Sequence, residues 1–445
     1  MRLYSTITFL GWLSRGALAA MVKEGSTCTV TPESTNEKRA WPHGTPPIKA
    51  RAEDPSINVL QSREPQFPGG GQRVDDTPSI LSAFKECGQD GHIIIEEGDY
   101  MVRQIMDVPG LKNVHIDIYG HLEWSGDNIQ YWLSNSLPVT YAARSTAWRI
   151  GGTNITMLGH GKALFFGNGQ IWYDQNRDQS NQNGRPISLT LWYANDVFID
   201  GITWRQSQFW NTFIAHSQNI TMTNIDMNST SASQWGTVNT DGTDTWNSRD
   251  VVLKNWTVTC GDDCISVKGN STNISVSNAT CYESGCMVIG SMGNPPSQAE
   301  YVDDVVFENV FCRHSSNAAW IKTYPGVGHV RNVTFRNIAF EDVNQPIYVS
   351  PCIYSGQNCD NSRIPITDIT WQNITGTSRY NIGAGMYCSR SSPCQNFRFE
   401  DIDIRSKNGD DIKFLCSNIA NQNSMGLQCT GPCPSNFPQQ LNGNR

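Results

Sequence analysis

Three aspartates in two short glycine-flanked segments carry the side chains best suited to chemistry. Asp241 lies in Asn-Thr-Asp-Gly, and Asp262 and Asp263 lie side by side in Gly-Asp-Asp-Cys. Carboxyl groups can hydrolyse a glycosidic bond when one keeps a proton and another stays ionised. Three of them within several ångströms cannot all ionise at their usual pKa, so at least one should keep its proton in mildly acidic solution. The spacing predicts acid–base chemistry if the fold brings both segments together.

The simpler alternative is that each aspartate stabilises only its own turn. Asp side chains often accept hydrogen bonds from the backbone two residues further on. A lone Asp-Gly would be explained in that way. Two acidic segments about one repeat apart favour a shared site, because the chain between and around them is repetitive.

Short runs of alternating apolar residues recur every 20–35 residues from Asp75 onward. Each run begins with Asn or Asp, and all but the first reach a second Asn or Asp after three or four further residues. They occupy residues 154–158, 196–203, 219–225, 250–255, 273–279, 304–310, 332–338, 368–374 and 396–402. Such a period indicates stacked units that bury their apolar faces against neighbours. Because the runs alternate with period two, we predict an all-β, single-domain, right-handed parallel β-helix. A β-sandwich is the alternative, but hairpin signals such as Asn-Gly are scarce between the strands.

Composition narrows the classes of partner. The 445 residues carry a net charge of -8 and are 38% hydrophobic but only 17% charged. The acidic balance argues against nucleic acid and anionic membranes as partners. No apolar stretch reaches the length of about 18 residues that a membrane span needs.

Several features indicate a secreted, extracellular protein. Residues 1–20 resemble a signal peptide, with Arg2, an apolar run and a small-residue cleavage site. Fourteen Cys residues fit disulfides in an oxidising compartment, and their spacing does not resemble a zinc site. Candidate glycosylation sequons lie at Asn154, Asn219, Asn228, Asn255, Asn270, Asn273, Asn278, Asn332 and Asn373. Residues 32–70 are rich in Pro and charge, so we expect residues 21–74 to be partly extended or disordered and the β-helix to span 75–445.

From about Asp75 to the C-terminus, the chain resembles glycoside hydrolase family 28, the polygalacturonase and rhamnogalacturonase group. The motifs that carry this resemblance appear in the family's order. They are Asp75-Asp76-Thr77 with Ala83, Gly167-Asn168-Gly169-Gln170-Ile171-Trp172-Tyr173-Asp174, Arg185-Pro186, Asn239-Thr240-Asp241, Gly261-Asp262-Asp263-Cys264, Ile289-Gly290-Ser291 and Ile321-Lys322-Thr323. The family fold is a right-handed parallel β-helix, which agrees with the repeat pattern.

The resemblance implies roles for individual residues. Asp262 would be the general acid, and Asp241 and Asp263 would activate the attacking water. Lys322 would hold a galacturonate carboxylate. Further substrate-binding positions would be Asn239, Trp320 and Tyr354. The resemblance also implies the disulfides Cys264–Cys281 and Cys388–Cys394. It implies no cofactor and no metal, a pectic polysaccharide or oligogalacturonide substrate, and a monomer.

Two departures from the family pattern refine the expected activity. Gly285 stands where most polygalacturonases have His, and Trp320 replaces the Arg of Arg-Ile-Lys. The absence of the family's His and Arg argues against an endo-acting enzyme. In these two positions the chain resembles fungal exo-acting galacturan 1,4-α-galacturonidases and exo-rhamnogalacturonases. We expect an exo-acting, inverting enzyme that releases terminal galacturonic acid, with insertions near residues 120–150 and 350–365 closing one end of the binding site. Cleavage at a galacturonate–rhamnose linkage is the main alternative. A pectin or pectate lyase and an inactive pectin-binding β-helix are less favoured, because all three aspartates and Lys322 are present.

Other polar and aromatic residues near these motifs carry weaker expectations. His160, His216 and His314 are expected to be structural, and Asp244 is expected to be a hydrogen-bonding neighbour of Asp241. Aromatic residues that could stack on a sugar ring, or simply pack, are Trp235, Trp246, Trp320 and Tyr324.

Overall fold

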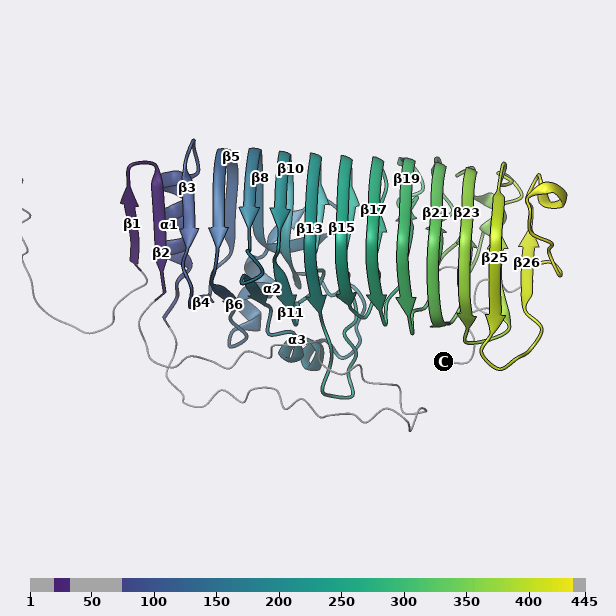
Figure 1. Cartoon of the computed structure of the whole chain (residues 1–445), viewed down its shortest axis with the longest axis horizontal. Coiled ribbons are helices and arrows are strands. Elements are labelled where there is room, and N and C mark those ends of the chain that lie inside the picture. Colours follow the sequence, from purple (N-terminus) through teal and green to yellow (C-terminus); the bar gives the residue numbers. More distant parts are fainter. Residues whose placement is uncertain (1–19, 33–73, 355, 435–445) are drawn as a thin grey trace, which may run out of the picture.

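The computed structural model describes residues 20–32, 74–354 and 356–434. Its strands lie side by side along one long axis, as Figure 1 shows, and almost all pair in parallel with the strand one coil away. This confirms the predicted parallel β-helix. Residues 1–19 of the predicted signal peptide and residues 33–70 of the Pro-rich segment lie outside the described residues.

One long parallel series of strands forms the face seen in Figure 1. Each strand pairs with the next member of the series, so one strand from each coil contributes to it. Its members are β3 (His92–Ile95), β5 (Met106–Ile118), β8 (Arg144–Leu158), β10 (Pro186–Asp200), β13 (Gln218–Asn228), β15 (Arg249–Thr259), β17 (Ser271–Tyr282), β19 (Ala299–Arg313), β21 (Val327–Val343), β23 (Ile366–Ser378) and β25 (Arg398–Ser406).

A second parallel series branches from β10 and carries the candidate site. Its members are β12 (Thr212–Ala215), β14 (Thr243–Trp246), β16 (Ile265–Val267), β18 (Met287–Met292), β20 (Ala319–Thr323), β22 (Ile347–Ser350), β24 (Ile382–Tyr387) and β26 (Lys413–Ser417). A shorter series comprises β4 (Asp99–Val102), β6 (His121–Trp124), β9 (Leu164–Phe166) and β11 (Thr203–Arg205). It joins the long series through β13.

The N-terminal end of the β-helix is closed by a hairpin and a helix. Strands β1 (Ala20–Glu24) and β2 (Thr27–Thr31) pair antiparallel, and β2 continues the sheet in parallel with β3. The helix α1 (Thr77–Cys87) is tied to β2 by the disulfide Cys28–Cys87. Strand β2, which lies in the segment predicted to precede the β-helix, therefore belongs to the sheet of the β-helix. The predicted start of the catalytic domain at residue 75 stays a prediction.

Smaller elements project from the coils. They are the helices α2 (Ile129–Asn135) and α3 (Gly169–Asn176), the strand β7 (Leu137–Val139), and the 3-10 turns Cys359–Asn361 and Gln422–Ser424. Strand β7 turns back antiparallel onto β8. Tyr141, in the turn between the two strands, packs on Trp246 of the second series. Among the described residues, no helix is long and apolar enough to cross a membrane.

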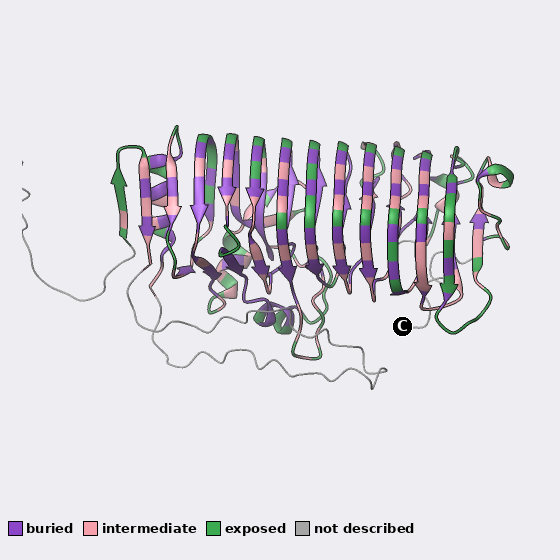
Figure 2. Cartoon of the chain, in the orientation of Figure 1, coloured by how far each residue is buried: buried purple, intermediate pink, exposed green. Residues whose placement is uncertain are grey.

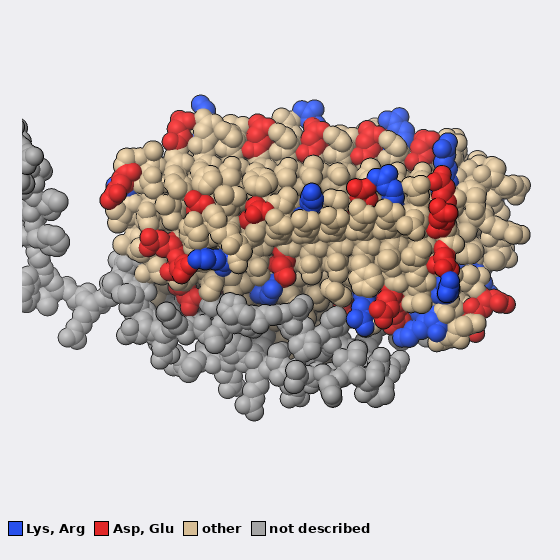
Figure 3. All heavy atoms as spheres, viewed as in Figure 1, with Lys and Arg blue, Asp and Glu red and all other residues tan. Residues whose placement is uncertain are grey.

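The period-two pattern becomes a column of apolar side chains inside the coils. Burial alternates along the strands, which Figure 2 shows as bands of buried and exposed residues. In β17, Ile274 and Val276 are buried, and they align with Val305 and Phe307 on β19. The face seen in Figure 3 carries acidic and basic side chains interspersed among the other residues.

The Asn and Asp residues that punctuate the repeats form two ladders at the turns. In the first ladder, nearly every coil places one Asn or Asp in the left-handed region, for example Asn219 at φ 53° and Asn273 at φ 56°. In the second ladder the corresponding residues include Asn224 and Asn278. Most of the Asn side-chain amides donate to the oxygen of the Asn or Asp one coil earlier, as Asn273 does to Asp250 at 2.6 Å. Asn and Asp tolerate this conformation better than other non-glycine residues, which explains why the repeat needs them.

The sequons differ in exposure. Asn228 is buried with 3% exposure, so the folded chain has no room for a glycan there. Asn270 is half-buried and accepts a hydrogen bond from the backbone of Tyr301. The remaining seven are exposed members of the ladders, namely Asn154, Asn219, Asn255, Asn273, Asn278, Asn332 and Asn373.

Six disulfides cross-link the described chain. Both pairs implied by the resemblance, Cys264–Cys281 and Cys388–Cys394, are present. The others are Cys28–Cys87, Cys286–Cys312, Cys352–Cys359 and Cys416–Cys429. Cys260 and Cys433 are free and buried.

Candidate active site

Two stacked turns preceding β14 and β16 carry the three aspartates. A backbone bridge joins Val238 to Gly261, and the next paired positions are Thr243 and Ile265. The buried guanidinium of Arg185 supports the first turn, since its Nη1 donates to the Val238 carbonyl at 2.9 Å. Parallel stacking of adjacent coils thus holds the two acidic segments against each other.

The stacking brings the three carboxyl groups together. One oxygen from each of Asp241, Asp262 and Asp263 lies within 4.8 Å of the others. Asp241 and Asp263 are buried, whereas Asp262 is half-buried and reaches closer to solvent. The backbone of Asn239 is in the left-handed conformation at φ 57°. Its side-chain amide donates to Asp262 Oδ2 at 2.7 Å.

Crowding and burial raise the proton affinity of this group. Burial, followed by the negative charge of Asp263, raises the pKa of Asp262 to about 6. Burial and then the charges of Asp262 and Asp244 raise the pKa of Asp241 well above its usual value. The cluster therefore holds at least one proton in mildly acidic solution, as three crowded carboxyl groups require.

Lys322 on β20 neutralises one of the three carboxylates. Its Nζ donates to both oxygens of Asp263, at 3.0 and 2.8 Å, and both side chains are almost fully buried. The same ammonium lies 4.0 Å from the centre of the Trp320 ring and donates to Tyr354 Oη at 3.3 Å. All four residues predicted to bind substrate, Lys322, Asn239, Trp320 and Tyr354, contact the aspartates or one another.

Gly285 leaves room for Asp263. A Cβ atom at position 285 would stand 2.5 Å from Asp263 Oδ1, well inside any real contact. The absence of a side chain at this position is therefore required for the carboxylate as it stands.

Arg144, which the sequence analysis missed, approaches the site from the other side. It begins β8 opposite Val139 of β7, and its Nη1 donates to the Asn181 carbonyl at 3.4 Å. The Asn181 backbone N–H donates in turn to Asn239 Oδ1 at 2.7 Å. Burial lowers the pKa of Arg144, while Tyr141, Asp241 and Asp244 raise it. Among the described residues, its buried Nε has no hydrogen-bond partner. Arg144 lies outside the motifs that carry the family resemblance, so no motif signalled it.

A second buried ion pair lies beside the aspartates. Lys268 Nζ is 2.9 Å from Asp244 Oδ1, with side chains 5% and 0% exposed. Burial raises the pKa of Asp244 to about 6 even though Lys268 acts in the opposite direction. Lys268 also faces the rings of Tyr141 and Trp210 at 5.8 and 5.1 Å. Asp244 thus belongs to the surroundings of Asp241, and Lys268 was not foreseen.

Other predicted candidates have contacts of their own. Trp246 is buried against Tyr141 and His216. His314 lies near Glu283 and Asp342. Trp235 lies 6.0 Å from the Arg177 guanidinium. Tyr324 lies 6.0 Å from Tyr354 and borders the Lys322 group.

The three aspartates also form an oxygen set of the kind that Ca²⁺, Mg²⁺ and Mn²⁺ prefer. Lys322 already supplies a positive charge at Asp263, however, which competes with an ion at that carboxylate. The arrangement is better suited to proton transfer than to metal binding.

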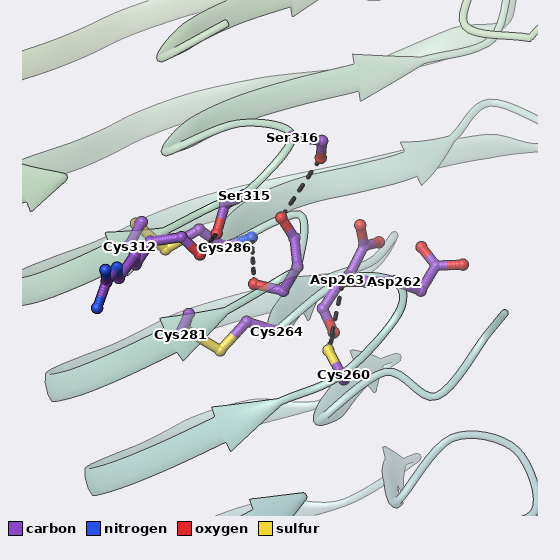
Figure 4. Close-up of a disulfide and its surroundings, with 11 residues drawn as sticks. Cys260, Asp262, Asp263, Cys264, Cys281, Cys286, Cys312, Ser315 and Ser316 are labelled. Atoms are coloured by element: carbon purple, nitrogen blue, oxygen red, sulfur yellow. Dashed lines mark hydrogen bonds between the residues drawn. A yellow bond between two sulfur atoms is a disulfide. The ribbon is translucent and has the colours of Figure 1, made fainter. Parts of the chain in front are cut away.

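The turn bearing Asp262 and Asp263 is anchored from behind by sulfur. Figure 4 shows both carboxylates pointing away from the Cys264–Cys281 disulfide. The free thiol of Cys260 donates to the Asp262 carbonyl at 3.4 Å. Burial raises the pKa of this thiol well above its usual value, so it remains a neutral packing group.

Comparison with known proteins supports the resemblance. Residues 100–425 match the family described as Glycosyl hydrolases family 28. The chain is 34% identical to the α-L-rhamnosidase rgxB of Aspergillus niger, over 82% of this chain and 89% of that protein. It is 32% identical to an exopolygalacturonase of Cochliobolus carbonum, over 81% and 84% of the two chains. The crystal structure of the endo-xylogalacturonan hydrolase from Aspergillus tubingensis shares the fold, with a TM-score of 0.72 at 24% identity over 82% of this chain and 98% of that one. The protein is therefore a glycoside hydrolase and belongs to family 28.

Proposed function

We propose that this enzyme is secreted and removes galacturonic acid from the non-reducing ends of pectic galacturonan. The observation that carries the proposal is the convergence of Asp241, Asp262 and Asp263 beside the buried ammonium of Lys322. The names of its relatives, several of which are exopolygalacturonases, support the exo mode and the substrate. Six disulfides support an oxidising, extracellular environment.

Asp262 is the proposed general acid. It is the least buried of the three aspartates, and a pKa of about 6 keeps it protonated in mildly acidic solution. Its hydrogen bond from Asn239 fixes one carboxyl oxygen, leaving the other to meet the glycosidic oxygen. Proton donation to that oxygen allows the sugar to leave.

Asp263 and Asp241 are the proposed water-activating groups. Lys322 keeps the Asp263 carboxylate oriented through two hydrogen bonds. Asp241 lies on the adjacent coil, so a water between the two would contact both. Removal of its proton as the glycosidic bond breaks completes hydrolysis.

Cations on both sides of the aspartates fit an acidic substrate. Lys322, with Trp320 and Tyr354 around it, lies toward the C-terminal coils, and Arg144 lies toward the inserted hairpin. We propose that each contacts a uronate carboxylate, because charge-assisted hydrogen bonds are the strongest the protein can offer. The hairpin at residues 137–146 would close the site beyond the terminal sugar.

The spacing of the carboxyl groups and the resemblance to family 28 predict different stereochemistry for the reaction. Inverting enzymes usually keep their carboxyl groups about 6.5–9.5 Å apart and retaining enzymes about 5–5.5 Å apart. The nearest oxygens here lie within 4.8 Å. The resemblance to family 28 implies inversion, and three carboxyl groups in place of two leave a pair, Asp241 and Asp263, to hold the attacking water while Asp262 acts as the acid. We therefore propose inversion.

A second candidate is hydrolysis next to rhamnose. The α-L-rhamnosidase rgxB shares 34% identity with this chain over most of both lengths. Trp320 supports this alternative, since the resemblance places an Arg there in galacturonate-binding members, and an aromatic face packs on a less polar sugar.

One experiment separates these possibilities. The purified enzyme is incubated with oligogalacturonide, rhamnogalacturonan oligomer and an aryl α-L-rhamnoside, and proton NMR follows the first anomer released. Galacturonic acid from the first substrate, appearing as the inverted anomer, supports the proposal. Unsaturated products would instead indicate a lyase. Asp262→Asn should lose 10²–10⁴-fold in kcat, roughly what a general acid contributes, with an unchanged thermal midpoint. Near-normal turnover in that variant would disprove the assigned role.

A further inference from the structure

A cluster of imidazoles around one carboxylate lies on the outside of the N-terminal coils, away from the aspartate site. His92 Nε2 is 2.6 Å from Asp117 Oδ2, and His115 Nε2 and His160 Nε2 are 3.2 and 2.7 Å from Asp117 Oδ1. The three histidines thus aim the same ring nitrogen at a single carboxyl group. The acid–base mechanism uses none of these residues.

The register of the β-helix creates this cluster. His92 on β3 pairs with His115 on β5, so their side chains stand one strand spacing apart, about 4.8 Å. Asp117 follows His115 by two residues and therefore projects from the same face of the strand. His160 follows β8 in the left-handed conformation at φ 54°, and its ring stacks on Tyr119 at 4.5 Å.

The donor atoms have the chemistry and the proximity of a transition-metal site. One ligand atom each from His92, His115 and Asp117 lies within 4.8 Å of the others. Imidazole nitrogen with a carboxylate oxygen is a common zinc donor set, whereas Ca²⁺ and Mg²⁺ prefer oxygen alone. Zinc bonds of about 2.0–2.2 Å place neighbouring ligand atoms roughly 3.4 Å apart, so small side-chain rotations would admit the ion.

Access and support also suit an ion. The side chains of His92 and His115 are 36% and 44% exposed, which gives an ion a path from solvent, while Asp117 is 11% exposed. His160 holds the carboxylate from the third coil, in the way that metal-bound carboxylates are usually hydrogen-bonded from behind.

We propose that His92, His115 and Asp117 bind one zinc ion, with His160 orienting the Asp117 carboxylate. The ion would join neighbouring coils near the closed N-terminal end of the β-helix. Its role is structural, because it lies on β3 and β5 while the aspartates precede β14 and β16. Ligand binding to the folded state alone would stabilise the protein in proportion to the logarithm of the zinc concentration.

Calorimetric titration of the untagged, chelator-treated full-length enzyme with zinc chloride tests the proposal. We expect one ion per chain and a thermal midpoint that rises with zinc concentration. The double variant His92→Gln/His115→Gln should bind at least about tenfold more weakly. His329→Gln is the matched control, because His329 also pairs with an aspartate on the outer surface, Asp303 at 2.9 Å, but with no second histidine. Cobalt should give the visible absorption of a tetrahedral nitrogen–oxygen site in the control and not in the double variant.

Three outcomes would overturn the site. They are no zinc binding by the wild-type enzyme, equal binding by the wild type and the double variant, and equal weakening in His329→Gln. Circular dichroism establishes that the double variant is folded, and Asp117→Asn provides a second variant of nearly unchanged shape. The free thiols of the described chain, Cys260 and Cys433, are buried and do not offer zinc an alternative site.

Discussion

Replacing Gly285 with Ala tests whether the exact placement of Asp263 matters for turnover. The new Cβ would lie 2.5 Å from Asp263 Oδ1, whereas ordinary contact begins at 3.4 Å. The carboxylate must therefore retreat by about 0.9 Å. Because Lys322 holds both of its oxygens, that retreat also disturbs the two hydrogen bonds at 3.0 and 2.8 Å. A displacement near 1 Å at a reacting group costs roughly 100-fold in rate, or about 2.7 kcal/mol in activation free energy.

The assay is the initial rate of galacturonic acid release at saturating oligogalacturonide. We expect kcat to fall about 100-fold in Gly285→Ala, with a loss of about 1–3 kcal/mol in unfolding free energy from overpacking. Gly431→Ala is the matched control, since no atom lies within 4 Å of a Cβ at that position. A Gly285→Ala enzyme with wild-type kcat would refute the argument that Asp263 must stand where it does. Gly285→His should be no better, because its side chain begins with the same Cβ.

Three further predictions follow from the site. First, kcat/KM should fall about tenfold per pH unit above pH 6, because the proposed acid Asp262 acts only when protonated and its pKa is about 6; a rate that stays flat to pH 8 would exclude Asp262 as the acid. Second, Arg144→Gln should raise KM for oligogalacturonide about tenfold, the value of a charge-assisted hydrogen bond, and leave kinetics on a carboxyl-reduced oligomer unchanged; equal effects on both substrates would show a structural role only. Third, Lys322→Met leaves Asp263 buried without its partner, so denaturant unfolding at neutral pH should show a loss of about 3–5 kcal/mol. Lys23→Met, which removes an exposed pair with Glu86 at 3.5 Å, should cost less than about 1 kcal/mol, and equal losses would contradict the burial argument.

The repeat pattern predicted the fold because each coil carries its own evidence. Alternating apolar residues fill the interior, and the Asn and Asp residues occupy left-handed turns that few other residues tolerate. Every repeat supplies these signals again, so errors in single strands do not matter. The hairpin β1–β2 was missed because its two short strands belong to no repeat, and β2 pairs with a strand over 60 residues later.

The candidate site was only partly predictable, for a reason visible in the register. Residues about one coil apart were expected to meet, and Asp241, Asp262 and Asp263 do. Between the bridge Val238–Gly261 and the pair Thr243–Ile265, however, the first turn holds one residue more than the second. That extra residue determines how the two turns fit, and no periodicity specifies it.

The sequence alone did not assign certain residues outside the repeat to a site. Arg144 reaches the site through a hairpin whose path depends on packing of Val139 and Tyr141 against the coils. The histidine cluster unites residues from three coils. Its three members are 23 and 45 residues apart, with His121 intervening, and these spacings resemble no metal motif.

Two buried ion pairs lie among the aspartates of the site, and burial is the largest cause of the raised pKa values there. Four carboxyl groups gather there, and two buried ammonium groups oppose them. Lys268 pairs with Asp244 and Lys322 pairs with Asp263. Among the described residues, Asp241 and Asp262 have no cationic partner of their own, but burial is the largest cause of their raised pKa values and also of the raised pKa of Asp244, which has one. The proton that Asp262 would donate is therefore held mainly by burial and by the negative charge of Asp263.

Loss of the Asp262 proton would suit the transition state better than the substrate. Glycoside hydrolysis develops positive charge on the sugar ring, and the carboxylate that Asp262 becomes when it donates its proton would stabilise that charge. The proposed uronate substrate carries a carboxylate of its own, which the same negative charge would repel. A cation that meets the uronate without neutralising the aspartates would resolve the conflict. Arg144 has such a placement, because its hydrogen bond goes to the Asn181 carbonyl and not to an aspartate.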